Sequence, residues 1–372
     1  MPRADRTQSS STQSSPVSQA SQTALSPQLD QDDAPRVLIV RLSAIGDVVQ
    51  SMPIACALRD RFPRAWIAWA VEQRAAALLE GHPEVDELIT LPRRWLKSPG
   101  GVLKLRRRLR AMRFDVALEA QGLTKSAIFA RLSGAPRRIG FGGRWGRELS
   151  QWINTEAAPI TAEHVVDRNL QLLEPLGIHQ PAVRFGMPEV PAEQAAAKRI
   201  LAELGIKVPP AIINVGAGWP SKLWPTERFA AVARYLRSRW NLPTLLVYGP
   251  AHERRMAEQM AKWSAGAARL APPTTLTELR GLARAARLFI GCDTGPLHLA
   301  AGVGTPCVGL FGPWPASQHG PYGEGHVALQ AVAIEGTRQR RKASPELMRK
   351  ITVEQACRAC ERVLRRSERE AA

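Results

Sequence analysis

The stretch RVLIVRLSAIGDVVQSMPIACALRD, residues Arg36–Asp60, sets the architecture expected for this chain. It contains an apolar run typical of a buried strand, then a tight turn with one glycine, then a helical pattern. A second stretch with the same order, LFIGCDTGPLHLAAGVGTPCVGLFGP, spans Leu288–Pro313. Each turn carries one carboxylate, Asp47 in the first and Asp293 in the second. We therefore expect two α/β domains facing a common cleft, with the two carboxylates opposite each other.

The rest of the chain alternates between apolar runs and helical patterns. Seven runs are mostly apolar rather than alternating, as expected of parallel strands that are covered on both faces. These expected strands are Val37–Val40, Ala65–Val71, Val116–Glu119, Ile212–Val215, Leu245–Tyr248, Leu288–Cys292 and Cys307–Leu310. The clearest expected helices are Pro53–Phe62, Lys125–Leu132, Glu193–Leu204, Glu227–Arg239 and Glu278–Ala286. This alternation predicts a doubly wound α/β fold.

The length of 372 residues suits two domains. Three prolines in PAVRFGMPEVP, residues 181–191, indicate a linker between an N-terminal domain at 35–183 and a C-terminal domain at 190–372. An amphipathic helix is expected over residues 351–366. Residues 1–34 are rich in Ser, Gln and Thr, which predicts a disordered arm without the apolar core of a signal peptide. No apolar run is long enough to span a bilayer.

The chain carries 51 Lys and Arg against 33 Asp and Glu, a net charge of +18. Its partners are therefore expected to be anionic: nucleic acid, acidic lipid or phosphorylated sugar. Residues 93–113 form a basic amphipathic pattern, which is either a solvated face or a contact for an anionic acceptor or membrane. A nucleic-acid-binding function is disfavoured, because aromatic-interleaved basic motifs, zinc-ligand spacing and RNP-like strands are missing.

The five cysteines form no spaced framework, which favours a reduced, cytosolic setting. Cys357 and Cys360 form a single C-x-x-C without a second pair, so we expect them on the inner face of the last helix and expect no metal site. The glycines between Gly140 and Gly146 are not expected to follow a strand with a helix behind it. The dinucleotide-binding fingerprint therefore fails, and no NAD or other cofactor is expected.

The two turns contain the candidate catalytic and binding residues. Asp47 lies where a strand meets a helix, so it is either a general base toward a hydroxyl or a helix cap. Thr294 and Gly295 occupy a helix N-terminus, whose free N–H groups suit an anion. Asp293 is expected to accept hydrogen bonds from sugar hydroxyls. His298, one helical turn further on, is either a core residue or part of the site.

A glycine-containing loop between the two turns, Asn214–Pro225, leaves an expected strand and delivers Lys222. Its N–H groups and this lysine are expected to hold a diphosphate, although the P-loop spacing is absent. The alternative is a solvated loop lysine. A further loop after a strand supplies Glu253, a candidate partner for a ribose.

Four motifs together resemble glycosyltransferase family nine, the bacterial heptosyltransferases. They are SAIGD at 43–47, EAQGLTKSA at 119–127, SKLWP at 221–225 and DTGPLHLAA at 293–301. The AQGLTKSA portion is most similar to heptosyltransferase I. The resemblance covers residues 36–364 and implies a GT-B fold, in which two Rossmann-like domains face a central cleft. It also implies an inverting transfer without a bound metal.

The resemblance further implies the roles of individual residues. Asp47 would be the base on the acceptor hydroxyl, and Lys222 would neutralise the departing diphosphate. The implied donor is ADP-heptose and the implied acceptor is Kdo-lipid A. The enzyme would be cytoplasmic and peripherally associated with the anionic inner-membrane surface, whereas a related transferase for another nucleotide sugar stays open. Donor contacts are implied at Glu253, Asp293, Thr294, Gly295 and His298, and acceptor contacts at Gly46, Gln121, Lys125, Arg94 and Lys97.

Overall fold

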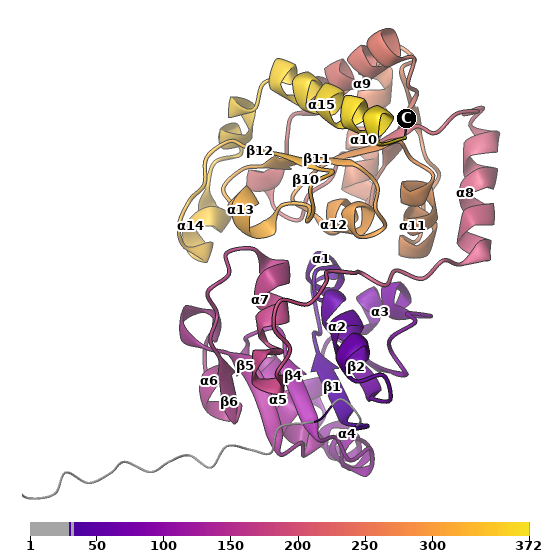
Figure 1. Cartoon of the computed structure of the whole chain (residues 1–372). Helices are drawn as coiled ribbons and strands as arrows, with labels where there is room; N and C mark the ends of the chain where they lie inside the picture. The colour runs from indigo at the N-terminus through magenta and orange to yellow at the C-terminus, as the bar shows by residue number, and fades with distance from the viewer. Residues whose placement is uncertain (1–29, 31–32, 372) are drawn as a thin grey trace, which may run out of the picture.

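The structure is a computed structural model that describes residue 30 and residues 33–371. The arm expected over 1–34 therefore lies almost entirely outside the described residues. The described chain forms two α/β domains, one above the other in Figure 1. Residues 181–190, which belong to neither a helix nor a strand, carry the chain from the lower domain to the upper one.

The N-terminal domain contains a six-stranded parallel sheet with the order β3-β2-β1-β4-β5-β6. Its central strand pairs Val37 with Ile67 on one side and with Val116 on the other. All side chains from Val37 to Val40 are fully buried, because helices cover both faces of this strand. The strands are β1 (Arg36–Val40), β2 (Trp66–Glu72), β3 (Glu87–Leu91), β4 (Val116–Glu119), β5 (Arg137–Phe141) and β6 (Glu156–Ala158).

Helices cover both faces of this sheet. The chain first winds from β1 to β3, and right-handed crossovers place α1, α2 and α3 on one face. It then crosses back to β4, so α4, α5 and α6 cover the other face. Helix α7 packs against α2 on the first face. The bounds are α1 (Ile45–Val49), α2 (Pro53–Arg61), α3 (Gln73–Leu79), η1 (Trp95–Lys97), α4 (Pro99–Ala111), α5 (Thr124–Ser133), η2 (Gly143–Trp145), α6 (Ser150–Ile153), α7 (Val165–Gln171) and η3 (Glu174–Leu176).

The C-terminal domain repeats this plan, with a parallel sheet in the order β12-β11-β10-β7-β8-β9. The strands are β7 (Ala211–Asn214), β8 (Thr244–Val247), β9 (Ala268–Leu270), β10 (Leu288–Cys292), β11 (Cys307–Phe311) and β12 (Val327–Gln330). The helices are α8 (Pro191–Glu203), η4 (Pro220–Lys222), α9 (Thr226–Trp240), α10 (Ala251–Trp263), α11 (Leu276–Arg284), α12 (Gly295–Gly302), α13 (Ala316–His319), α14 (Thr337–Lys342), η5 (Pro345–Lys350) and α15 (Val353–Ala371).

The strand order reverses once in each sheet, between β1 and β4 and between β7 and β10. Connections on either side of such a reversal diverge to opposite faces and leave a crevice at the C-terminal ends of the strands. Asp47 and Asp293 both lie in turns at these positions. Helix α1 lies directly below α12 in Figure 1 and contacts it, so the two points of reversal lie opposite each other. The predicted GT-B architecture is confirmed.

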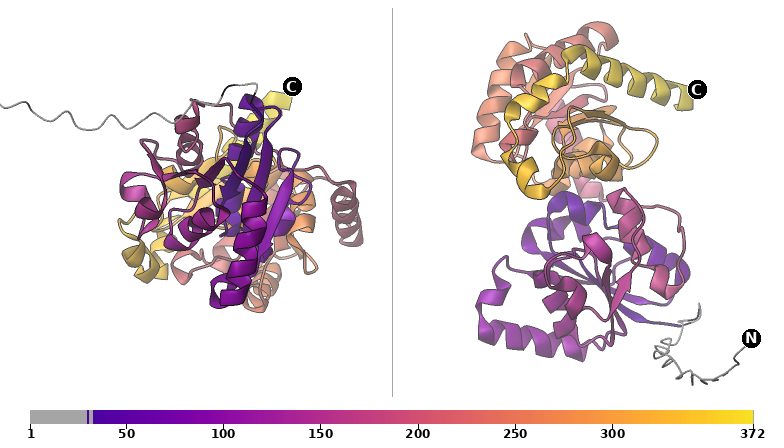
Figure 2. Two further views of the ribbon diagram at one scale, coloured as in Figure 1. Left: turned by 90° about the horizontal axis from the view of Figure 1, so that it is seen from below. Right: turned by 90° about the vertical axis from the view of Figure 1, so that its left-hand side faces the viewer.

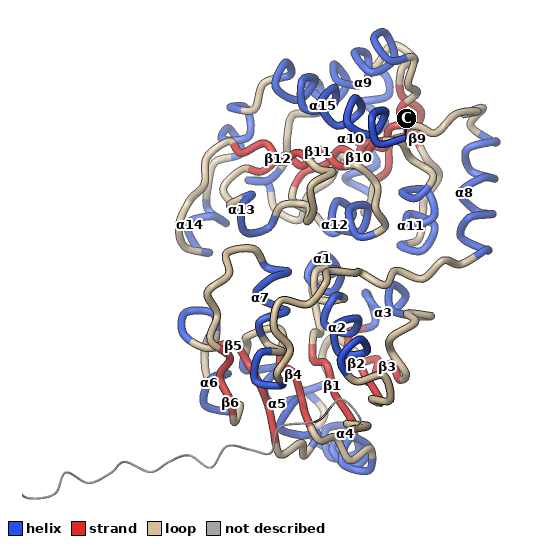
Figure 3. Tube along the Cα trace, in the orientation of Figure 1, coloured by secondary structure: helices blue, strands red, loops and turns tan. Residues whose placement is uncertain are grey.

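All seven expected strands exist to within one residue at each end, whereas five others were missed (Figure 3). The missed strands lie toward the edges of the sheets, where apolar side chains alternate with exposed or charged ones. They are β3, β5, β6, β9 and β12. Strand β5 begins with two arginines, and alternate residues of β12 are exposed. The rule of a continuous apolar run therefore found only the strands near the centre of each sheet.

The structure confirms one prediction about a short segment and partly corrects another. Helix α15 exists and buries Cys357 and Cys360, as predicted. The expectation about the glycines at 140–146 was wrong in part, because Gly140 lies within β5 and Gly142 directly follows it. The next α-helix begins only at Ser150, so no tight strand–turn–helix phosphate site forms there. Within residues 33–371, no helix combines the length and apolar character needed to cross a bilayer.

Candidate active site between the domains

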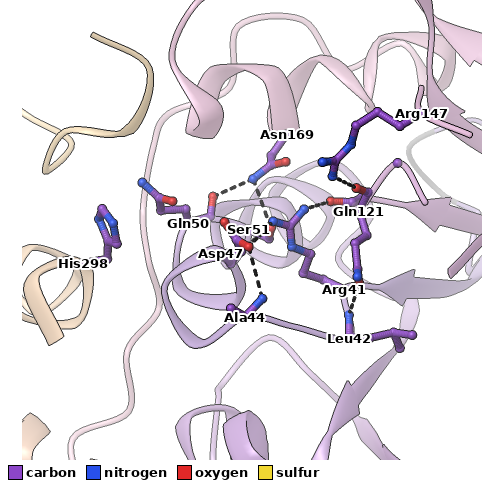
Figure 4. Close-up of polar contacts among 12 residues, drawn as sticks. Arg41, Leu42, Ala44, Asp47, Gln50, Ser51, Gln121, Arg147, Asn169 and His298 are labelled. Carbon is purple, nitrogen blue, oxygen red and sulfur yellow. Dashed lines mark hydrogen bonds and ion pairs between the residues drawn. The ribbon is translucent and has the colours of Figure 1, made fainter. Parts of the chain in front are cut away.

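Asp47 lies in the first turn of α1, immediately after β1. Its Oδ2 atom accepts a hydrogen bond from the Ala44 N–H at 3.1 Å and lies 3.1 Å from a guanidinium nitrogen of Arg41. The Asp47 side chain is 39% exposed. Figure 4 shows it beside Arg41 and Ala44. Burial raises its pKa, but Arg41 and the Ala44 N–H outweigh that effect, and the pKa falls below the ordinary value. Asp47 therefore supports the helix end and also presents a charged carboxylate.

Arg41 and Gln121 lie next to Asp47 and join the end of β1 to the end of β4. Arg41 is 7% exposed and donates to the carbonyl of Ala120, at the end of β4. Gln121 accepts a hydrogen bond from the Leu42 N–H at 2.9 Å, so the neighbouring strand ends β1 and β4 are tied together. Figure 4 shows these groups around Asp47. Sequence reasoning named Gln121 but missed Arg41, which directly follows the expected strand Val37–Val40 and carried no separate signal.

Glu119 holds the Gln121 loop in place from inside the sheet. Its side chain is fully buried and accepts from the N–H groups of Gln121 at 3.0 Å and Gly122 at 2.8 Å. Burial raises the pKa of Glu119 despite these bonds. Glu119 therefore has a structural role, because it holds in place the loop formed by the rest of the EAQG motif.

A second set of bonds holds α1 from the opposite side. Asn169 of α7 donates to the carbonyl of Gln50 at 2.9 Å and to the Ser51 hydroxyl at 3.0 Å. Ser51 in turn donates to the backbone carbonyl of Asp47 at 2.8 Å. Asn169 lies more than 100 residues from this turn in sequence, so no local pattern could have identified it.

The predicted acceptor residues occupy the same edge of the N-terminal sheet. Lys125, at the start of α5, pairs with Glu72 at the end of β2 and donates to the Arg93 carbonyl at 3.2 Å. This bond anchors the segment after β3, on which Arg94 and Lys97 are exposed. Their expected contact with an acceptor stays a prediction.

The C-terminal side of the site is a chain of three charged or polar groups. Lys222 Nζ lies 2.5 Å from Asp293 Oδ2, and His298 Nε2 lies 3.3 Å from Asp293 Oδ1. All three are largely buried, and the ammonium also lies 4.2 Å from the centre of the Trp314 ring. Burial raises the pKa of Asp293, but the bond to His298 and the charge of Lys222 hold that pKa well below its usual range. We name these residues the Lys222–Asp293–His298 triad.

The turn that we predict to bind an anion lies at the start of α12. Thr294 is the N-cap residue but makes no side-chain cap bond. Its hydroxyl instead donates to the Cys292 carbonyl at 3.1 Å and accepts from Asn214 at 3.3 Å. The N-terminal N–H groups from Gly295 onward thus lie at the positive end of the helix dipole.

Glu253 lies at the neighbouring strand end, at the start of α10. Its carboxylate accepts from the Gly249 N–H at 2.7 Å. It also covers Gly216, where an added Cβ would lie 2.0 Å from the Glu253 carboxyl carbon. The carboxylate therefore lies directly over the glycine-containing loop, so the loop and Glu253 are adjacent.

The two domains meet closely at this site. An added Cβ on Gly46 would lie 2.6 Å from His298 Cδ2, and one on Gly295 would lie 2.8 Å from Ile45 Cγ2. His319, on α13, acts electrostatically on both Asp47 and Asp293, and burial lowers its own pKa to about 4. Neither His319 nor its helix had a sequence signal. The two turns therefore face each other as predicted.

Further bonds join the domains beside the site. The Tyr322 hydroxyl donates to Asp167 at 2.6 Å, and the Ser317 hydroxyl donates to Glu163 at 2.6 Å. The ring of His164 lies 4.9 Å from that of Tyr322. The two domains are thus also in contact between residues 163–167 and residues 317–322. Among residues 33–371, no group of three or more His, Cys, Asp or Glu is arranged to hold a metal ion.

Comparison with known proteins agrees with this geometry. The sequence model of glycosyltransferase family 9 (heptosyltransferase) matches residues 102–349. The chain belongs to this family. Lipopolysaccharide heptosyltransferase 1 of Pseudomonas aeruginosa is 30% identical over 304 residues, covering 79% of this chain and 83% of that protein. Lipopolysaccharide heptosyltransferase 3 of Escherichia coli K12 is 30% identical over 279 residues, covering 72% and 79%.

Solved structures of family 9 glycosyltransferases share the fold. One from Veillonella parvula superposes with a TM-score of 0.77 at 22% identity, covering 91% of this chain and 98% of that one. Escherichia coli heptosyltransferase WaaC with ADP superposes with a TM-score of 0.70 at 22% identity, covering 88% and 99%. The prediction that the chain is a family 9 lipopolysaccharide heptosyltransferase is confirmed, and with it the prediction that the protein is a glycosyltransferase.

Proposed function

We propose that this family 9 glycosyltransferase moves heptose from ADP-heptose to the Kdo region of lipid A during synthesis of the lipopolysaccharide inner core. The observation that carries the proposal is the close approach of the Asp47 turn, at Gly46, to His298 of the Lys222–Asp293–His298 triad across the domain boundary. Such a site has a base on one domain and a cation on the other, as a transfer between two bound substrates requires.

Asp47 acts on the acceptor. The acceptor hydroxyl oxygen attacks the anomeric carbon of the heptose, and its proton passes to the Asp47 carboxylate. The lowered pKa of Asp47 keeps it deprotonated through neutral pH, the state a base needs. Arg41 and Ala44 hold Oδ2, which leaves the other carboxylate oxygen for the acceptor.

Lys222 acts on the leaving group. The bond between the anomeric carbon and the diphosphate oxygen breaks as the new bond forms, and both electrons leave with ADP. The new negative charge is stabilised by the Lys222 ammonium and by the N-terminus of α12 at Thr294 and Gly295. Attack and departure occur on opposite sides of one carbon, so the anomeric configuration inverts.

The donor's remaining parts have partners nearby. Asp293 and His298, which bond to each other, would contact the heptose, and Glu253 would accept hydrogen bonds from the ribose. Two structures of relatives, Escherichia coli WaaC with ADP and with ADP-2-deoxy-2-fluoro heptose, support an ADP-linked donor for this chain. Domain contact around the site would exclude water and limit hydrolysis of the donor.

The acceptor side carries positive charge. Lys125, Arg94 and Lys97 lie along the C-terminal edge of the N-terminal sheet, where the carboxylates and phosphates of Kdo-lipid A would approach. Because that acceptor is a membrane lipid, we place the reaction at the cytoplasmic face of the inner membrane. No nucleic acid is required at any step.

The test measures ADP release from ADP-heptose with and without Kdo-lipid A. We expect release that depends on the acceptor. Thermal shifts with ADP, UDP and GDP give the donor class, because a ligand at a hundred times its Kd stabilises a protein by about 2.7 kcal/mol. Stabilisation by UDP or GDP alone would replace ADP-heptose with another nucleotide sugar. Absence of release with the acceptor present would overturn the proposal.

A further inference from the structure

The positive charge of the chain is concentrated in one segment. Residues 93–155 contain fifteen Lys and Arg but only Asp115, Glu119 and Glu148 as acids, a net charge of +12 out of +18. Glu119 is fully buried, so two acids remain on the outside. A charge that served only to keep the protein soluble would be spread over both domains. This charge is instead concentrated in the N-terminal domain.

The helices of this segment form one layer over the sheet. Helices α4, α5 and α6 cover the same face of the N-terminal sheet, with α5 packed against both of the others. Helix α4 lies at the bottom of the N-terminal domain in Figure 1, away from the C-terminal domain. The left view of Figure 2 shows the molecule from this side, from below. We call the outer surface of these helices and of η1 the α4–α6 face.

Large apolar side chains are exposed on this face. Trp152 of α6 is 86% exposed, and Leu149 and Leu103 are each 54% exposed. With Leu96, at 39%, they make four of the seven large apolar side chains exposed among residues 33–371. A largely exposed tryptophan on a cationic surface is typical of segments that lie at a membrane interface, where the ring enters the headgroup region.

The cations of α4 are available to bind a partner outside the chain. Among the described residues, only Arg108 of its five cations is ion-paired, with Glu87 at 2.9 Å. Arg106 and Arg107 are exposed on the outer side of the helix. Their charge attracts anionic lipid, whereas exposed leucines and Trp152 add nothing to the binding of a purely polar polyanion.

We propose that the α4–α6 face docks on an anionic lipid bilayer, with Trp152 and Leu149 inserted among the headgroups and the cations of α4 above them. This rests on the proposed function, because a lipid acceptor explains why the enzyme meets a membrane. The Leu149 N–H donates to Thr124 at 3.2 Å, so the inserted residues lie beside the start of α5 and Lys125. Docking through this domain leaves the C-terminal domain free to open and close.

The experiment is co-sedimentation of the full chain with vesicles that contain no acceptor. Wild type is expected to bind phosphatidylethanolamine/phosphatidylglycerol vesicles and not phosphatidylcholine vesicles. Trp152→Ser is expected to weaken binding several-fold, and the double change Arg106→Glu with Arg107→Glu about tenfold or more, with a loss of salt dependence. Trp152→Phe should also lose the quenching of tryptophan fluorescence by brominated lipid.

Matched controls lie on α10 of the other domain. Trp263 is 42% exposed, and Arg255 and Lys262 are exposed, so Trp263→Ser and the double change Arg255→Glu with Lys262→Glu should bind vesicles like wild type. Equal losses in the two domains, or no vesicle binding, would overturn the proposal. Loss with the charge reversals but not with Trp152→Ser, together with binding to DNA, would show a general polyanion surface instead.

ADP release with detergent-dispersed acceptor separates this proposal from the proposed function. Trp152→Ser should turn over normally in detergent and slowly on vesicles. An enzyme that turns over in detergent but ignores vesicles disproves only the docking surface. A protein that binds vesicles through Trp152 but releases no ADP disproves only the reaction.

Discussion

Gly46 of the N-terminal domain lies against His298 of the C-terminal domain, with no room for a side chain between them. A Cβ atom on residue 46 would be 2.6 Å from His298 Cδ2, closer than any ordinary contact. Because His298 bonds to Asp293 and Asp293 to Lys222, this contact connects the turn of the proposed base to the groups around the leaving diphosphate. The absence of a side chain at residue 46 therefore permits the site to assemble.

Gly46→Ala should lower turnover by at least about tenfold while leaving the free energy of unfolding nearly unchanged. The methyl group obstructs domain contact, but within α1 alanine is favoured over glycine by roughly 0.5–1 kcal/mol. Kinetics of ADP release and thermal unfolding would check this. The control is Gly100→Ala, since an added Cβ there meets nothing within 4 Å. Wild-type turnover of Gly46→Ala would refute the assembled site.

Lys222→Met should weaken ADP binding and reduce turnover by about a hundredfold. It also leaves Asp293 buried without its cation, which costs about 3–5 kcal/mol of stability. The double variant with Asp293→Asn should recover most of that stability and none of the turnover, as unfolding and kinetic measurements would reveal. Lys198→Met, on the exposed side of α8, should behave like wild type. Recovery of turnover in the double variant would remove Lys222 from the reaction.

His319 should make stability depend on pH. Burial lowers its pKa to about 4 in the folded chain, although Asp293 and Asp47 act in the opposite direction and Arg168 and His298 also face it. An unfolded histidine titrates near 6.5, so the unfolded chain binds the extra proton first and stability falls as pH drops from about 6.5 to about 4.

His319→Gln should remove roughly 2–3 kcal/mol of that loss, as measured by chemical denaturation at pH 7 and pH 4.5. His179 is exposed, so His179→Gln should keep the wild-type profile and serves as the control. An unchanged profile in His319→Gln would mean that the surrounding protein does not lower the pKa of this imidazole.

Tyr322→Phe should lower kcat/KM by roughly fivefold to twentyfold, because it removes a hydrogen bond of 2.6 Å that joins the domains through Asp167. Each domain keeps its own core, so the unfolding temperature should barely move. Tyr235→Phe is the matched control, since its hydroxyl bonds to Glu361 within the C-terminal domain. Equal effects of the two changes would argue against a role for the bond in domain closure.

The sequence predicted those parts of the site that follow a strand directly. Asp47 and Asp293 could be found because a buried strand, a glycine turn and a helix start lie within a few residues of each other. Central strands were visible for the same reason, since burial on both faces leaves an unbroken apolar run. Edge strands such as β6 and β9 bury little and left no such pattern.

Partners brought in from distant elements could not be predicted. Arg41 is held by a carbonyl 79 residues away, and Asn169 reaches the Asp47 turn from α7. The sequence also treated Lys222 and Asp293 as separate contacts, because nothing in a loop's composition says which way its lysine turns. Their ion pair is a product of the tertiary fold.

The most direct test of the account is transfer by Asp47→Asn, which keeps the shape of the side chain and removes its ability to take a proton. ADP release with Kdo-lipid A present should fall by at least about a hundredfold, while the Kd for ADP stays within about twofold of wild type. Normal turnover by this variant would contradict the assignment of Asp47 as the base.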